Sequence, residues 1–157
     1  MTRRAAQPGD GAPDGATGDP RLDADTLPVC RTAAAHVRLV DDARWPWLML
    51  VPARAEATEI HHLAPDERAS LIEEVSLASA ALERATGCAS VNVAALGNVV
   101  ARLHVHVVAR RPGDPNWPGP VWGFGERVPR ARDASGEARE PAFVAAVREA
   151  LAGRRER

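Results

Sequence analysis

The chain has 157 residues, a length that suits one domain with a substantial hydrophobic core. Its hydrophobic fraction is 45% and its formal net charge is −1, so no overall charge favours a nucleic acid or a membrane surface as partner. The sequence shows no apolar leader segment and no apolar run long enough to span a bilayer, so we expect no membrane partner.

The beginning of the chain and the cysteines set the next expectations. Residues 1–20 are rich in Gly, Pro, Ala and Asp without any periodic apolar pattern, which predicts a disordered tail. Cys30 and Cys88 lie far apart and form no CxxC motif, so a disulfide framework is not expected. A reducing cytoplasm is the location that this cysteine usage favours.

Two strands are predicted next. The segment "HVRLV" (36–40) alternates as a strand does, and the following "DDAR" has the residues of a turn. The segment "WPWLMLVP" (45–52) is a more continuously apolar strand, with Pro46 at its beginning, where a missing N–H does little harm. The two segments together predict a hairpin or two neighbouring strands.

A long helix is predicted over residues 65–86. Pro65 suits the first helical turn, Asp66 and Glu67 complement the positive end of the helix dipole, and Gly87 can end the helix. One stripe at helical spacing, which we expect to face the core, contains Leu71, Val75, Ala78 and Leu82.

The second half of the chain predicts two more strands, a long loop and a C-terminal helix. These are "SVNVAA" (90–95), "VVARLHVHVVAR" (99–110), the Pro/Gly-rich loop 111–125 and the amphipathic helix 140–153, with Phe143, Val144, Val147 and Leu151 on one side. This element order favours an α+β fold with a mostly antiparallel sheet. We expect one domain over residues 21–125 and a C-terminal extension over residues 126–157.

The histidine-containing strand has two different faces. Side chains alternate along a strand, so Arg102, His104 and His106 should share one face, which we expect to be polar and partly open. The opposite face should be core, formed by Leu103, Val105, Val107 and Ala109. Arg110 and Arg111 are predicted to form a solvated strand end.

The residues alone allow three interpretations of the histidine pair. An imidazole titrates near neutral pH and can attack phosphorus, and its bond to phosphorus is labile to water. His104 and His106 could instead be metal ligands, or strand residues without a chemical role. The turn before the strand contains Gly97 and Asn98, whose backbone N–H groups could cradle an anion.

The flanking residues carry a family resemblance. The segment "NVAALGNVVARLHVHVVARR" (92–111) resembles the active-site region of the histidine triad (HIT) superfamily, with its His-x-His-x-His pattern. The upstream "LVDDARWPWLMLVPAR" resembles the paired strands that precede the long helix in that family. The "DPNWPGPVWG" segment resembles a bacterial subgroup of HIT proteins. The resemblance covers roughly residues 27–124, and it implies a HIT-like α+β fold and a homodimer.

The resemblance implies a nucleotide hydrolase or nucleotidyl transferase that acts on a small nucleotide substrate without a cofactor. It places on His104 the attack on the α-phosphorus, which forms a nucleotidyl-histidine intermediate. His106 would hydrogen-bond the phosphate or the leaving group. Asn92 resembles the asparagine that helps to hold the nucleotide, and Gly97 and Asn98 resemble the turn near the phosphates.

One position departs from the family pattern. The first triad position is Arg102, which could contact a phosphate as a substrate-binding residue or could weaken the site. Two alternatives follow from this departure and from the histidine pair. The first is a nucleotide-binding module without turnover, and the second is a metal-dependent enzyme with His104 and His106 as ligands.

Overall fold

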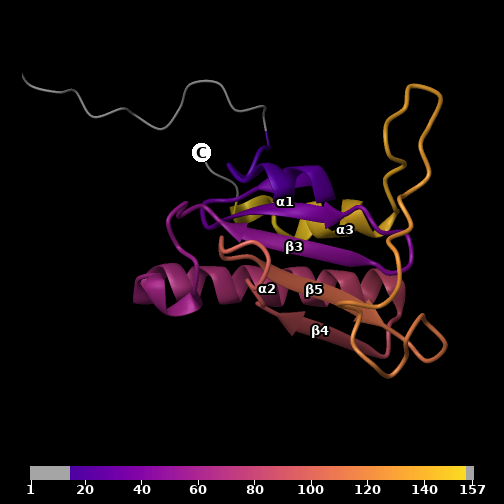
Figure 1. The fold of residues 1–157 in the computed structure, drawn as a ribbon. Helices are drawn as coiled ribbons and strands as arrows, with labels where there is room; N and C mark the ends of the chain where they lie inside the picture. The colour runs from indigo at the N-terminus through magenta and orange to yellow at the C-terminus, as the bar shows by residue number, and fades with distance from the viewer. Residues whose placement is uncertain (1–14, 155–157) are drawn as a thin grey trace, which may run out of the picture.

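A five-stranded antiparallel sheet forms the centre of the molecule. The computed structural model describes residues 15–154, and its strands follow the order β1-β2-β3-β5-β4 (Figure 1). Every neighbouring pair is antiparallel. The strands are β1 (Thr26–Arg31), β2 (Ala35–Val40), β3 (Trp47–Pro52), β4 (Ser90–Ala94) and β5 (Val105–Arg110). The predicted α+β class with an antiparallel sheet is confirmed.

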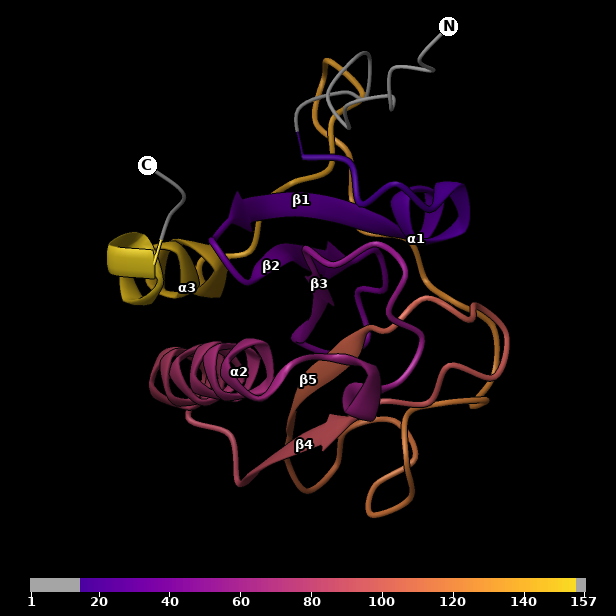
Figure 2. The same cartoon turned by 90° about the vertical axis from the view of Figure 1, so that its left-hand side faces the viewer.

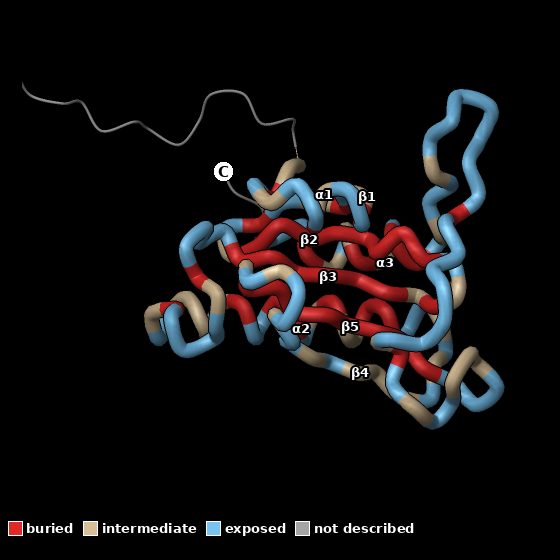
Figure 3. Tube along the Cα trace, in the orientation of Figure 1, coloured by how far each residue is buried: buried red, intermediate tan, exposed pale blue. Residues whose placement is uncertain are grey.

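The three central strands are the buried ones. Every residue of β2, β3 and β5 is buried, whereas β4 is partly exposed and only Thr26 and Val29 of β1 are buried (Figure 3). The sequence did not predict β1. Pro28 obscures its pattern, and the register of the strand shifts between Pro28 and Cys30. An edge strand tolerates such a proline because one side of it needs no ladder hydrogen bonds.

The strand that contains the histidines is shorter than predicted. It begins at Val105 rather than at Val99. Its pairing with β3 begins at Val105, opposite Leu50, and its pairing with β4 begins at His106, opposite Ala94. The residues before it bond elsewhere, since the N–H of Leu103 donates to the carbonyl of Ala57 at 2.9 Å. Arg102–His104 therefore leave the sheet and lie against the loop after β3.

The helices are α1 (Pro20–Asp25), α2 (Pro65–Thr86) and α3 (Phe143–Ala150), with short 3-10 turns at η1 (Ile60–His62) and η2 (Ala152–Arg154). The prediction for α2 is confirmed at both ends. The Glu67 carboxylate accepts from the N–H of Ala64 at 2.6 Å, and Gly87 ends the helix with a φ of 61°. That left-handed conformation favours glycine.

Two apolar clusters lie on opposite faces of the sheet. Figure 2 shows α2 and α3 side by side on one face. The predicted core stripes of both helices are buried there, together with Leu103, Val105, Val107 and Ala109. The other face carries a smaller cluster of Leu22, Val40, Trp45, Trp47, Met49, Val51, Val108 and Val121. Leu22 of α1 and Val121 of the loop after β5 thus cover the sheet opposite α2, and the predicted extension contributes α3 to the main core.

Residues 15–20, the last part of the predicted disordered tail, belong to the described structure. Residues 1–14 lie outside the described part of the chain, but Thr17 is buried and its N–H donates to the Asp23 carboxylate at 2.9 Å. The Asp19 carboxylate caps α1 by accepting from the N–H of Arg21 at 2.9 Å. We refer to Gly15–Asp25 as the N-terminal strap.

Arg110 is buried, contrary to the prediction of a solvated strand end. Its guanidinium is 1% exposed and donates to both carboxylate oxygens of Asp114 at 2.8 Å. It also donates to Asn92 Oδ1 at 3.1 Å and to the carbonyl of Gly119 at 3.0 Å. The ring of Trp117 lies 5.7 Å from the guanidinium carbon. Arg110 therefore links β4, β5 and the loop that follows.

Replacement of Asp114 by alanine should strongly destabilise the protein. It leaves a buried guanidinium without its carboxylate, and breaking such a pair from one side costs about 3–5 kcal/mol. Chemical denaturation measures the loss. The control is Arg127→Ala, which removes the exposed pair with Asp25 and should cost less than about 1 kcal/mol. Equal losses in the two variants would contradict the importance of the buried pair.

Candidate functional site

His106 is the second residue of β5 and His104 directly precedes this strand, and both rings lie on the face opposite α2. Their ring centroids lie 5.0 Å apart and the rings meet edge to face. As predicted, the alternating aliphatic residues between and beyond them face the core. The expectation of a polar, partly open face is wrong. His104 is 8% exposed and His106 is 6% exposed. Leu22 of the strap and Val121 of the loop after β5 lie in the apolar cluster on this side of the sheet.

The hydrogen bond of His104 fixes its tautomer. Its Nδ1 lies 2.6 Å from the carbonyl oxygen of Arg102. A carbonyl only accepts, so Nδ1 carries the proton. In the neutral ring the other nitrogen, Nε2, then bears a free lone pair. A ring held in this way can act as a nucleophile through Nε2.

His106 has the opposite arrangement. Its Nδ1 accepts from the indole N–H of Trp47 at 3.0 Å, so the proton of the neutral ring is on Nε2. Burial, with a smaller contribution from His104, lowers the pKa of His106 from 6.5 to about 3. The ring is therefore neutral at physiological pH and offers an N–H donor beside the lone pair of His104.

Aromatic rings hold His106 in place. Trp47 and Trp122 each lie 5.5 Å from its ring, and the two indoles lie 6.0 Å from one another. Trp122 thereby packs the loop after β5 against the sheet. The sequence pattern indicates a strand at Trp47 but no part for it in the site. The feature that could have indicated such a part is the pairing of β3 with β5, which sets Met49 opposite His106.

A hollow of about 400 Å³ opens beside His106. Its floor is formed by β2 and β3, and its far wall is the segment Val121–Gly125. Apolar and aromatic side chains alternate with charged ones around it. The residues that line it include Asp42, Arg44, Trp47, Trp122, Phe124 and Arg127. The Asp42 carboxylate accepts from the Arg44 guanidinium at 2.6 Å, and hydrogen bonds from Arg44 lower the pKa of Asp42 despite its burial.

Gly97 lies beside His104, Asn98 is exposed next to it in the chain, and Asn92 contacts Arg110. A narrow hollow of about 10 Å³ is lined by Gly97, His104, Thr58 and Glu59 among others. Gly97 has a φ of 66°, which favours glycine. Asn98 is exposed. Asn92 is opposite Val108 in register, and its Oδ1 accepts from Arg110.

The Arg102 side chain reaches the end of β3 and the loop that follows it. Its terminal nitrogens donate to the carbonyls of Pro52 at 3.0 Å and Ala55 at 3.3 Å. Burial lowers its pKa, and the carboxylates of Asp19, Asp23 and Glu56 oppose this effect. Its hydrogen bonds in the structure are thus to backbone, and its predicted contact with a phosphate stays a prediction.

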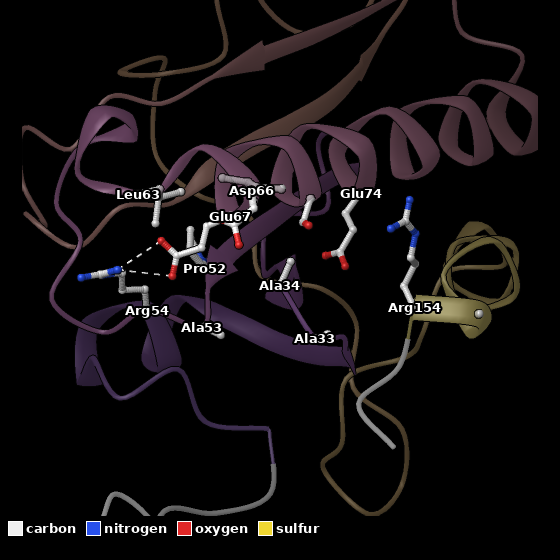
Figure 4. A pocket seen from close by; sticks show the side chains of 13 residues that line it. Ala33, Ala34, Pro52, Ala53, Arg54, Leu63, Asp66, Glu67, Glu74 and Arg154 are labelled. Carbon is white, nitrogen blue, oxygen red and sulfur yellow. Dashed lines mark hydrogen bonds and ion pairs between the residues drawn. The ribbon is translucent and has the colours of Figure 1, made fainter.

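A separate hollow of about 350 Å³ lies on the other side of the molecule, between α2, the end of β3 and η2 (Figure 4). Two of the carboxylates that line it, Glu67 and Glu74, have hydrogen-bond partners within the protein. Arg54 donates to Glu67 at 3.2 Å, and the buried Glu74 accepts from the Thr32 hydroxyl at 2.6 Å. Burial raises the pKa of Glu74. This hollow contains no histidine, and we assign it no function.

Metal binding and membrane insertion have no support in the described residues. Within residues 15–154, no three His, Cys, Asp or Glu side chains converge so that they could hold a metal ion. The alternative in which His104 and His106 bind a metal therefore has no third protein ligand in this range. No helix of the same range is long and apolar enough to cross a bilayer.

The fold and the paired histidines define an α+β protein of the histidine triad class, and comparisons with known proteins agree. The HIT domain family matches residues 22–113, so the chain belongs to this family. A histidine triad protein of Sinorhizobium meliloti is 46% identical, with a TM-score of 0.75 over 85% of this chain and 95% of that one. No curated protein matches the chain.

Two further solved structures are similar over nearly their whole length. A histidine triad protein of Bradyrhizobium japonicum is 41% identical, with a TM-score of 0.76 over 85% of this chain and 96% of that one. A histidine triad protein of Marinobacter aquaeolei is 36% identical, with a TM-score of 0.78 over 87% and 96%. The likeness therefore extends beyond the histidine segment to the whole fold.

The lowered pKa of His106 should appear in the pH dependence of stability. The unfolded ring binds a proton near pH 6.5 and the folded ring only near pH 3, so stability is lost as the pH falls through this window. Between pH 7 and pH 5 the loss from this group reaches about 2 kcal/mol. His106→Asn keeps an acceptor for Trp47 and cannot titrate, so it should lose that much less than wild type.

Denaturant titrations at the two pH values test this expectation. His61→Asn, at an exposed position, serves as the matched control and should follow wild type. A wild-type pH slope in His106→Asn would show that the ring titrates alike in the folded and unfolded states.

Proposed function

We propose that the chain is a nucleotide hydrolase or nucleotidyl transferase that acts at an α-phosphate through His104. The observation that carries this proposal is the opposed protonation of the two rings. The Nε2 of His104 has a lone pair because Nδ1 donates to the Arg102 carbonyl. The Nε2 of His106 has a proton because Nδ1 accepts from Trp47. A nucleophile and a hydrogen-bond donor therefore lie side by side.

The reaction follows from these two groups. The Nε2 lone pair of His104 attacks the α-phosphorus, a P–N bond forms, and the bond from phosphorus to the leaving group breaks. The leaving group takes up a proton from solvent. The N–H of His106 donates a hydrogen bond to a phosphate oxygen or to the leaving group, which stabilises developing negative charge. Water or another acceptor then attacks phosphorus and gives a proton to solvent, while the P–N bond breaks and its electron pair returns to Nε2 of His104.

The hollow beside His106 supports the placement of the nucleoside. Trp47, Trp122 and Phe124 offer aromatic surface for a base, and Arg127 offers donors at its rim. The turn at Gly97 and Asn98 is the proposed contact for the phosphate oxygens. Asn92, whose Oδ1 accepts from Arg110, is proposed to help hold the nucleotide. We also propose the cytoplasm as the location of this activity.

His104→Ala should abolish turnover, with a loss of at least about a thousandfold in kcat, since it removes the nucleophile. Turnover is measured on dinucleoside polyphosphates, nucleoside phosphoramidates and nucleotidyl sugars. Mass spectrometry should detect a nucleotidyl adduct on wild type and none on the variant. His62→Ala, at an exposed position near the site, should keep both turnover and adduct. Wild-type activity in His104→Ala would exclude the covalent mechanism.

A second candidate is a nucleotide-binding module without turnover. The burial of both rings favours it, because His104 is 8% exposed and the hollow beside it has only about 10 Å³. Calorimetry with AMP and a turnover assay on the same preparation separate the two functions. Binding without product or adduct supports the module, and product supports the enzyme.

We further propose a homodimer that forms through the β4 edge. No described strand pairs with the outer side of β4, so its backbone N–H and C=O groups on that side are available. Val93 on this strand and Leu96 just after it are 49% and 44% exposed. Apolar side chains beside an unpaired strand edge favour association with a second copy.

Val93→Arg should weaken this dimer. A charge buried at the interface costs more than about 1.4 kcal/mol, so the dissociation constant should rise at least about tenfold. Sedimentation equilibrium measures it. Val128→Arg, at an equally exposed valine outside the β4 edge, is the control. An unchanged dissociation constant in Val93→Arg would remove β4 from the interface.

A further inference from the structure

We propose that the Arg102 side chain is a positioning residue for His104, and that it acts by holding the backbone of residues 102–104 against the loop after β3. This inference rests on the proposed function of His104. It assigns to Arg102 a task that is separate from contact with substrate.

The backbone at Arg102 lies outside the sheet and needs other support. The strand begins only at Val105, so no ladder hydrogen bond fixes the carbonyl of Arg102. That carbonyl nevertheless accepts from Nδ1 of His104 at 2.6 Å and thereby sets the tautomer of the ring. A shift of the carbonyl would release Nδ1, and the proton could then move to Nε2. The lone pair that we propose for attack would be lost.

Three donors hold this segment on the end of β3 and the loop that follows it. The Arg102 guanidinium donates to the carbonyls of Pro52 at 3.0 Å and Ala55 at 3.3 Å. The N–H of Leu103 donates to the carbonyl of Ala57 at 2.9 Å. Two of these three bonds come from the arginine side chain. The guanidinium therefore forms a bridge between two points of the loop and the residue that orients His104.

The surroundings of the guanidinium keep it in this place. Arg102 is half-buried, and the N-terminal strap approaches it closely, since a Cβ at Gly18 would lie 3.7 Å from one of its terminal nitrogens. The carboxylates of Asp19, Asp23 and Glu56 surround it and favour its charged form. The charged group is thus confined between the strap and the loop, with its two terminal nitrogens engaged.

A contribution to folding stability does not by itself explain why an arginine occupies position 102. The Nε–H of Arg102 is buried and has no hydrogen-bond partner among the described residues. A buried donor without a partner lowers stability. The geometry of guanidinium does account for the residue, because its planar fork carries several donors and spans two carbonyls at once. A glutamine or lysine side chain presents fewer donors in fixed directions.

The first test reads the ring directly. In ¹⁵N-labelled protein, long-range ¹⁵N–¹H correlation spectra report which nitrogen of neutral His104 carries the proton. Wild type should show the proton on Nδ1. Arg102→Ala should show a mixture of the two tautomers. Arg21→Ala, which removes an exposed side chain that donates to the Val99 carbonyl, should remain as wild type. An unchanged tautomer in Arg102→Ala would overturn the proposal, whether or not the protein has catalytic activity.

The second test separates positioning from phosphate contact by kinetics. Arg102→Ala should lower kcat by roughly 10- to 100-fold, as for other lost supports of a reacting side chain, and should leave KM nearly unchanged. Guanidinium at millimolar concentration should restore part of kcat in this variant, and Arg102→Lys should retain an intermediate value. A raised KM with unchanged kcat and no rescue would overturn positioning and would identify a phosphate contact.

A failure of the positioning role and a failure of the proposed function give different experimental results. If wild type has no turnover on any nucleotide, the proposed enzyme is wrong, while the tautomer of His104 still tests the positioning role. Where Arg102→Ala does not fold, Arg102→Lys gives the same spectra with a conserved charge. A wild-type tautomer and wild-type kcat in Arg102→Lys would overturn the requirement for a bidentate bridge.

Discussion

The hydrogen bond from His104 Nδ1 to the Arg102 carbonyl is the interaction on which the site depends. It is made by a backbone oxygen just before the strand begins, and it determines which ring nitrogen keeps a lone pair. The adjacent strand supplies the matching constraint, since Trp47 donates to His106 and sets the other tautomer. Two adjacent imidazoles thereby acquire different chemistry from their partners alone.

Burial reinforces this difference. A histidine in water is charged for part of the time near neutral pH, but desolvation beneath Trp47 and Trp122 keeps His106 neutral. Two charged rings 5.0 Å apart would repel one another, so neutrality of one permits their approach. The apolar cluster on this face therefore contributes to the electrostatics of the site as well as to packing.

The sequence predicted those structural features that depend on residues close to one another in the chain. The long helix, with Pro65 at its start and Gly87 at its end, and the alternation around His104 and His106 were readable from the sequence because both follow backbone periodicity. The burial of Arg110 was not, since its partner Asp114 belongs to a loop whose path the sequence does not reveal. The apolar cluster on the histidine face likewise includes Leu22 and Val121, which are distant in sequence.

Two contacts of different kinds, an ion pair and an aromatic contact, hold the loop after β5 against the rest of the protein. Near its beginning, Asp114 pairs with the buried Arg110, and further along Trp122 packs against His106. A segment tied in this way has lost much of its conformational freedom before any ligand arrives. A nucleoside that enters beside Trp122 would meet a wall that is already ordered, so little of its binding free energy would be spent on arranging that wall.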